Sequence, residues 1–348
     1  MKKPFRCLPV GNLPYDTDKA ATKMTVKLFE NMPFLANLPN ASKDESLVKR
    51  TLMNTPGVIV ENNEAIFDDS DSDLKQKFVN LDSAFNNPVP ENLEPFGFDV
   101  FFLKKYYQII ARIKPAETVV NLLGPFSAAQ MLMTKEGTKF ISDKFYRKLV
   151  VQAVTVKALW IINKIKELSP ETKPLIIFEE PLLNKAGNIK REFEDVTHDV
   201  IVNIFFKMFS KIKDAGANSG IQCFEKCDWQ IPLEAGADLI SFDAYTNPNN
   251  LNIIPHKINK FLSQGGRINW AIVPVANETL VKSLSAEYIF DRFMKTTQGL
   301  ISKGANDKLV YDGSMVSIQG NIDHLPLIFA EKTLIIASQV AKRMPVIH

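Results

Sequence analysis

The stretch from Gly220 to Tyr245, GIQCFEKCDWQIPLEAGADLISFDAY, contains the pattern that decides the fold. It opens with an apolar run over Gly220–Phe224, continues through a short helical segment over Trp229–Ala235, and closes with a second apolar run over Leu239–Phe242. Near-continuous apolar runs of this length are typical of parallel strands that are buried on both faces. The stretch therefore predicts a strand–helix–strand unit whose two strands lie in one parallel sheet.

The same alternation of short apolar runs and helix-period segments continues along the chain. We predict strands at Arg6–Val10, Val58–Val60, Thr118–Leu123, Leu175–Phe178, Gly220–Phe224, Leu239–Phe242, Ile268–Val273 and Met315–Ile318. That makes about eight strands, the number that a closed parallel barrel needs. Long helices are predicted over Lys144–Leu168 and Phe193–Ala215, where apolar residues recur at helical spacing. We therefore expect an α/β fold, a (β/α)8 TIM barrel that occupies residues 1–348 as a single domain.

One region breaks this alternation. Residues 31–97 are rich in Pro, Asn, Asp and Ser, so we expect an irregular N-terminal insertion over one end of the barrel. Within it, the residues from Gly57 to Phe67 are expected to form a hairpin that turns at Asn62 and Asn63.

The composition excludes several classes of protein. The chain has 348 residues, of which 45% are hydrophobic and 23% charged, and this balance rules out general disorder. Its net charge of +3 is too small to mark a nucleic-acid or membrane surface, so neither is expected as a partner. The 3 cysteines fit a reducing compartment, and no apolar run has the length of a membrane span. Together with the absence of a signal-peptide pattern, these features predict a cytoplasmic protein.

Polar residues follow several of the predicted strands, at the barrel end where functional groups are expected. Glu179 and Glu180 form a carboxylate pair that is a candidate for general acid–base chemistry; alternatively, Glu180 caps the following turn and only Glu179 faces the rim. The N–H groups after Gly124 either receive an anionic ligand or belong only to a tight turn. Asp228 and Trp229 either line a pocket, or act as a helix cap and a packed indole.

The strand-end motifs, taken in order, resemble the cobalamin-independent methionine synthase family, and specifically its C-terminal catalytic barrel. The wider superfamily includes uroporphyrinogen decarboxylase. The resemblance rests on the stretch quoted above and on Gly11–Pro14, Met32–Phe34, Leu38–Pro39, Gly124–Pro125, Phe178–Pro181 and Phe261–Pro274. It implies a (β/α)8 barrel and places the chain among the short, divergent members.

The resemblance also implies a zinc ion, which in the family activates a thiol substrate as a thiolate for attack on a methyl group. The family's His, paired Cys, acidic and late Cys ligand positions fall on Gln222, Phe224, Asp243 and Gln319 in this chain. Only the acidic group is retained, because an amide is a poor zinc ligand and a phenyl ring is none. We therefore expect no cofactor at this position.

From this resemblance we expect a methyltransferase-related barrel that works without the thiol-activating zinc. Glu179 and Asp243 are its candidate catalytic residues, and Glu179 takes the position that holds the substrate amino group in the family. The candidate substrate-binding residues are Tyr15, Gln222, Asp228, Trp229 and Gln319. The expected partners are a small molecule in the barrel mouth and a methyl carrier, either a corrinoid protein or methylcobalamin.

Two alternatives stay open at this point. The chain is either a non-catalytic relative that binds a small molecule or a protein, or a methyltransferase with a relocated zinc site. The relocated site would use Cys223, Cys227, Asp243 and His324, since the two cysteines follow one strand at a Cys-x3-Cys spacing.

Overall fold

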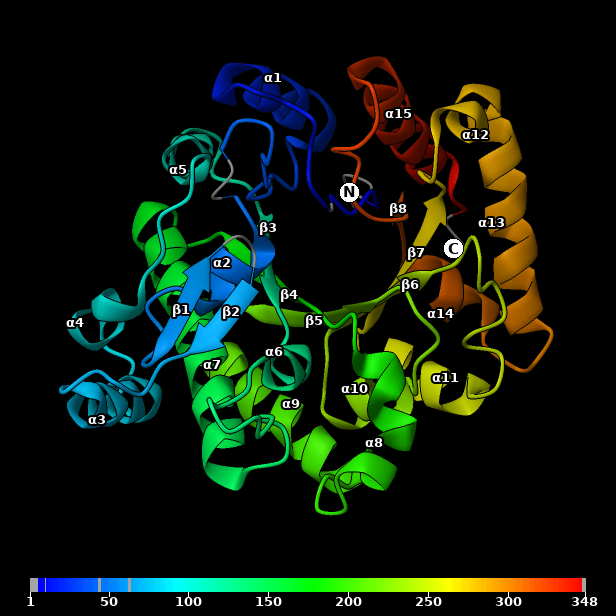
Figure 1. The fold of residues 1–348 in the computed structure, drawn as a ribbon. Helices are drawn as coiled ribbons and strands as arrows, with labels where there is room; N and C mark the ends of the chain where they lie inside the picture. Colours follow the sequence, from blue (N-terminus) through cyan, green and yellow to red (C-terminus); the bar gives the residue numbers. More distant parts are fainter. Residues whose placement is uncertain (1–5, 10, 43–44, 62–63, 346–348) are drawn as a thin grey trace.

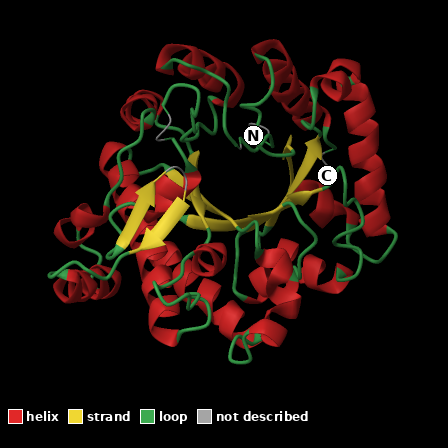
Figure 2. Ribbon diagram, viewed as in Figure 1, coloured by secondary structure: helices red, strands yellow, loops and turns green. Residues whose placement is uncertain are grey.

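The structure is a computed structural model that describes residues 6–9, 11–42, 45–61 and 64–345. Over these residues, a curled parallel sheet of six strands forms the centre of the molecule, and helices surround its outer face (Figures 1 and 2). Its strands pair in sequence order: β3 (Glu117–Leu123), β4 (Lys173–Glu179), β5 (Asn218–Cys223), β6 (Leu239–Asp243), β7 (Arg267–Val273) and β8 (Ser314–Ile318). The chain thus has an α/β, TIM-barrel-like fold.

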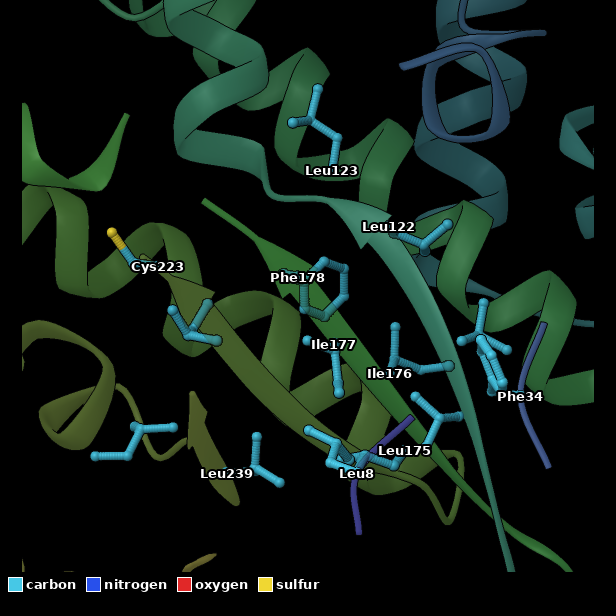
Figure 3. Close-up of a cluster of buried hydrophobic side chains, with 14 of the residues drawn as sticks. Leu8, Phe34, Leu122, Leu123, Leu175, Ile176, Ile177, Phe178, Cys223 and Leu239 are labelled. Carbon is cyan, nitrogen blue, oxygen red and sulfur yellow. The ribbon is translucent and has the colours of Figure 1, made fainter. Parts of the chain in front are cut away.

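Two N-terminal segments, which are not regular strands, lie between the two edges of the sheet. Cys7 forms a parallel bridge with Val316 of β8, and Phe34 forms a parallel bridge with Val119 of β3. The two segments also meet each other, because the N–H of Leu13 donates to the carbonyl of Asn37 at 2.9 Å. Figure 3 shows Leu8 and Phe34 from these segments beside the apolar side chains of the sheet.

Proline explains why these segments do not extend into strands. Pro9 follows Leu8 directly, while Pro33 and Pro39 flank the second segment. A proline has no N–H to donate to a ladder, so each pairing is limited to a few hydrogen bonds.

Six of the eight predicted strands are confirmed as members of the sheet, with boundaries within a few residues of the prediction. The prediction for Val58–Val60 is wrong for the barrel, because β1 (Val58–Glu61) pairs only with β2 (Glu64–Phe67) in an antiparallel hairpin. The expected strand Arg6–Val10 is reduced to the single bridge at Cys7, and Val10 lies outside the described residues. The hairpin itself is confirmed, although its turn at Asn62 and Asn63 also lies outside them.

Residues 31–97 are more regular than expected and do not simply cover one barrel end. They contain α2 (Leu47–Leu52), the hairpin, α3 (Leu74–Asn86), α4 (Pro90–Leu93) and the short 3-10 helix η1 (Glu94–Phe96). Helix α2 lies at the carboxyl end of the sheet, where the N–H of Leu123 donates to Oγ1 of Thr51 at 2.8 Å. The hairpin packs beside the start of α7, because the ring of Phe67 meets the rings of Phe140 and Tyr146 edge-on. Helices α3 and α4 also pack on the outer helix α7. Phe34 of the same region contributes to closing the sheet.

The outer helices follow the predicted periodicity. The predicted long helix Lys144–Leu168 is confirmed as α7, whereas α9 (His198–Asp214) begins five residues after the predicted start at Phe193. Thr197 sets that start, because its side chain accepts a hydrogen bond from the N–H of Val200. The remaining helices are α1 (Asp18–Phe29), α5 (Leu103–Ile113), α6 (Pro125–Met131), η2 (Leu183–Lys185), α8 (Ala186–Glu192), α10 (Gln230–Glu234), α11 (Pro255–Ser263), α12 (Glu278–Ser283), α13 (Ala286–Ile301), α14 (Asp307–Asp312) and α15 (Leu327–Arg343). Among the described helices, none has the length and apolar content needed to cross a membrane.

Candidate functional site

Glu179 is the last residue of β4, and its carboxylate is held on one side only. Its Oε1 accepts a hydrogen bond from Nδ2 of Asn121 on β3 at 2.7 Å. The side chain is partly exposed, and its second oxygen accepts no hydrogen bond from any described residue. Burial raises the pKa of Glu179, while the bond from Asn121 and the positive charge of Arg50 oppose that rise. The carboxylate therefore keeps one oxygen available for a ligand.

Four further polar side chains continue from Glu179 along the next strands. Gln222 of β5 pairs in register with Glu179, and its Oε1 accepts a hydrogen bond from Oγ of Ser241 at 3.4 Å. Nδ2 of Asn269 then donates to Oγ of Ser241 and to Oγ of Ser317, both at 2.8 Å. We call Asn121, Glu179, Gln222, Ser241, Asn269 and Ser317 the polar belt, since neighbouring strands of the sheet contribute them in turn.

One fully buried atom of the polar belt has no hydrogen-bond partner among the described residues. Asn269 is fully buried, yet its Oδ1 accepts no hydrogen bond within the described part of the chain. A buried acceptor left unsatisfied costs about 1–3 kcal/mol, so such atoms are generally paired with protein, ordered water or a ligand. Oδ1 of Asn269 therefore needs a hydrogen-bond donor that the described residues do not supply.

Arg50 of α2 connects the polar belt to the N-terminal segments. Its buried guanidinium donates to the carbonyls of Leu35 and Ala36 at 3.1 and 3.0 Å, and to Oδ1 of Asn37 at 3.0 Å. Glu45, which is equally buried, lies 3.9 Å from the guanidinium. These bonds use the Nη groups of Arg50 for protein contacts, so its role at this site is to position the segments and to add positive charge near Glu179.

Asp243, at the end of β6, is already bonded through both carboxylate oxygens. Its Oδ1 accepts from the N–H of Thr246 at 2.8 Å, and its Oδ2 accepts from Nε2 of Gln319 at 2.7 Å. Gln319 also donates to Oγ1 of Thr246 at 2.8 Å. The structure thus brings two predicted site residues, Asp243 and Gln319, into direct contact. They form a closed hydrogen-bonded cluster.

Glu180 lies on the opposite side of the sheet from Glu179 and is fully buried. Its Oε1 accepts from the N–H of Phe126 at 3.0 Å, and its Oε2 accepts from the N–H and the hydroxyl of Ser127 at 2.7 and 2.6 Å. Burial raises the pKa of Glu180 to about 7 despite these three bonds. The N–H groups at the N-terminus of α6 therefore bind the side chain of Glu180. Glu180 caps this helix and does not cap the turn that follows it in the sequence.

The other predicted substrate-binding residues make the following contacts, all with residues outside the polar belt. The hydroxyl of Tyr15 donates to Oε1 of Glu331 on α15 at 3.0 Å, and the ring is buried. Asp228 accepts the N–H of Gln230 at 3.0 Å at the start of α10. Trp229 is 2% exposed and packs edge-on against Phe242. These contacts fit the structural interpretation of Asp228 and Trp229.

The donor set does not fit the zinc ion that the resemblance implies. Gln222, Phe224, Asp243 and Gln319 offer one carboxylate, and that carboxylate is fully bonded.

The relocated alternative does not assemble either. Within the described residues, no group of three or more His, Cys, Asp and Glu side chains comes together in a way that could hold a metal. Cys223 and Cys227 do neighbour each other, but Nε2 of His324 bonds to the carbonyl of Val275.

Sequence reasoning missed Asn121 of β3 and Asn269 of β7, two amides of the polar belt. Their signal was visible, because each is a lone amide inside an apolar strand: VVNLL around Asn121 and INWAIV around Asn269. A polar side chain in such a run has to find a partner inside the fold. Arg50, in contrast, lies in the region that we expected to be irregular, and nothing in its local pattern indicates burial.

Comparison with known proteins assigns no family to the chain. No family model matches it, and no curated protein matches it. Among solved structures, it is similar to a crystal structure of a β-N-acetylhexosaminidase, with a TM-score of 0.34 and 9% sequence identity. The similarity covers 71% of this chain and 55% of that chain, so this chain spans little more than half the length of its structural match. A similarity of this size carries no information about substrate.

Proposed function

We propose that this chain binds a small amino acid with a thiol or thioether side chain at the carboxyl ends of β3–β8, and that Glu179 receives its ammonium group. The observation that carries the proposal is the state of the Glu179 carboxylate. One oxygen is fixed by Asn121, and the other is free of described partners and partly exposed. A carboxylate held in this way is oriented before the ligand arrives, which lowers the entropic cost of binding.

The rest of the polar belt supports the same class of ligand. Gln222 uses its Oε1 for Ser241, which leaves its Nε2 to donate to a ligand carboxylate. Asn269 lacks a donor at Oδ1, and a polar ligand or an ordered water supplies one. Neutral amides and hydroxyls next to one carboxylate favour a zwitterion over a highly charged molecule, because they offer donors and acceptors without excess charge.

Methyl transfer is the reaction that the resemblance to the methionine synthase family favours for such a ligand. With methylcobalamin as the methyl donor, the carbon–cobalt bond would break and its electron pair would stay on cobalt. A carbon–sulfur bond forms to the sulfur of homocysteine, and the thiol proton is released. In this chain, Glu179 would position the amine, while the Asp243–Gln319 cluster would orient the far side of the substrate.

A specific observation favours the non-catalytic alternative. Both oxygens of Asp243 already accept hydrogen bonds, so the group expected to move a proton is committed to protein contacts. Binding and catalysis therefore need separate tests.

The binding test is calorimetric titration of the chain with homocysteine and with methionine. The control ligand is 4-mercaptobutanoate, which keeps the thiol and the carboxylate but lacks the amine. We expect the amine to contribute at least about tenfold in affinity, equivalent to about 1.4 kcal/mol. If neither amino acid binds, or if the control ligand binds equally well, the binding proposal is wrong.

The catalytic test is methionine formation from methylcobalamin and homocysteine, with and without a chelator. Product that forms at the same rate in both samples supports zinc-independent methyl transfer. If no methionine forms although homocysteine binds, the methyl-transfer proposal is wrong and the non-catalytic alternative holds.

A further inference from the structure

A cavity between α3, α7 and α9, on the outer side of the sheet, shares no residue with the polar belt. It has a volume of about 300 Å³, at the small end of the range for ligand sites. Phe85 of α3, Val151 of α7 and Ile204 of α9 supply an apolar wall, and the last two are buried. The apolar group of a small ligand would be removed from water on entering this cavity, and that burial favours binding.

The charged residues around this cavity are all basic. Lys144, Arg147 and Lys148 of α7 and Lys207 of α9 line it, and no carboxylate does. Lys148 is neutralised by Asp82, whose Oδ1 lies 2.9 Å from its Nζ.

The other three cations are not neutralised in this way. Arg147 donates to the carbonyl of Ile141, and neither Lys144 nor Lys207 has a carboxylate partner in the described part of the chain. About three positive charges are therefore unmatched around an apolar cavity.

A fifth cation lies next to the same wall. Nζ of Lys211 lies 5.1 Å from the centre of the Phe85 ring, in a cation–π contact. Lys211 is on α9, one helical turn after Lys207, so both extend from the same helix. This contact adds positive charge beside the ring and holds the ring in place.

We propose that this cavity binds a small organic anion with an apolar body, an alkyl or aryl carboxylate. The body packs against Phe85, Val151 and Ile204, and the carboxylate lies between Lys144 and Lys207. This site is independent of the proposed function, because no residue of the polar belt contributes to it. Apolar burial and charge complementarity together give the site its selectivity, since either feature alone would admit many other molecules.

The experiment is titration of the full chain with octanoate and with 3-phenylpropionate, followed by ligand-observed NMR and calorimetry. Acetate carries the carboxylate but lacks the long alkyl group, whereas octanol has the alkyl group but no charge. We expect acetate to bind at least about tenfold more weakly than octanoate, because it buries no alkyl group. We expect octanol to bind about fivefold more weakly, because it forms no ion pair. The affinity of octanoate should fall as salt is added. The ratio of the octanoate and phenylpropionate affinities shows whether the cavity prefers an alkyl or an aryl group.

A double variant, Lys144→Gln with Lys207→Gln, tests the assignment to this cavity. We expect octanoate affinity to fall about fivefold, as two exposed ion pairs together predict. Lys213→Gln, on the same helix but outside the cavity lining, is the matched control and should bind as the unaltered chain does. All three positions are exposed or nearly so, and the variants are expected to fold. The proposal is overturned if neither carboxylate binds, if octanol binds as well as octanoate, or if the double variant is unaffected.

Discussion

Glu179 and Glu180 are neighbours in sequence at the end of β4, yet they differ in exposure and in the number of hydrogen bonds that they accept. Glu179 lies on the inner side of the sheet, is partly exposed and accepts one described hydrogen bond. Glu180 lies on the helix side, is fully buried and accepts three. The difference follows from the alternation of side chains along a strand. It teaches that a carboxylate pair read from a sequence can contain one binding group and one structural group.

The largest expected effect concerns the structural side of this comparison. A Cβ added at Gly124 would lie 2.0 Å from Oε1 of Glu180, so Gly124→Ala must displace a side chain that is held by three hydrogen bonds. We expect a loss of about 3 kcal/mol or more in the free energy of unfolding, measured by urea denaturation. Gly137→Ala is a poor control because of its positive φ, whereas Gly187→Ala has open space and should change stability little. Equal stability of Gly124→Ala and Gly187→Ala would refute the capping role of Glu180.

The next effect is the contribution of Glu180 to the pH dependence of stability. Its pKa in the folded chain, about 7, lies above the ordinary value of 4.5, so the folded state binds a proton that the unfolded state has released. The free energy of unfolding should therefore decrease as pH rises from about 4.5 to about 7, by an amount on the order of 3 kcal/mol from this group. Glu180→Gln cannot ionise and should lose this component. Parallel pH profiles for the two proteins, from denaturation at each pH, would contradict the account.

On the binding side of the comparison, Glu179→Gln should act on the ligand and not on the fold. We expect homocysteine affinity to fall at least about tenfold, because the amide keeps the shape of the side chain and removes its charge. Stability should stay equal or increase slightly, since the variant no longer buries a charge. Glu171→Gln, an exposed carboxylate before the opposite end of β4, is the matched control. Titration calorimetry and scanning calorimetry on the three proteins measure the homocysteine affinity and the stability. Unchanged affinity in Glu179→Gln would show that Glu179 does not bind the ligand.

The smallest expected effect is at Asp243. Asp243→Asn keeps a hydrogen-bonding side chain toward Gln319 and Thr246, so we expect a loss of about 1 kcal/mol in stability and less than twofold in homocysteine affinity. The variant also tests catalysis. If the chain makes methionine and Asp243→Asn stops it without weakening binding, Asp243 is an acid–base group and the positioning role assigned above is wrong.

The sequence predicted the sheet well because buried parallel strands are nearly continuous apolar runs. It failed at Arg6–Val10, where Pro9 limits the pairing to a single bridge, and at Val58, whose apolar neighbours belong to a hairpin. It also did not predict that Phe34, in the region expected to be irregular, pairs with β3. Those errors share one cause. A short apolar run indicates burial or pairing, but it does not indicate which partner the run will have.

The site was predicted in part. Glu179, Gln222, Asp243 and Gln319 lie at the carboxyl ends of the strands, as the strand assignments require. Tyr15 could not be placed in advance, because its partner Glu331 is 316 residues away along the chain. The separation of Glu179 from Glu180 was one of two alternatives, and only the position of α6 decides between them.

The most direct test of the account compares the two glutamates in one experiment. Homocysteine is titrated into Glu179→Gln and Glu180→Gln at pH 8, and urea denaturation of both variants and of the unaltered chain is measured at pH 8 and at several pH values between about 4.5 and 7. We expect Glu179→Gln to lose binding and keep its stability, whereas Glu180→Gln keeps binding while folded and loses the Glu180 component of the pH dependence of stability between about 4.5 and 7. Loss of binding in Glu180→Gln, together with full binding in Glu179→Gln, would contradict the account.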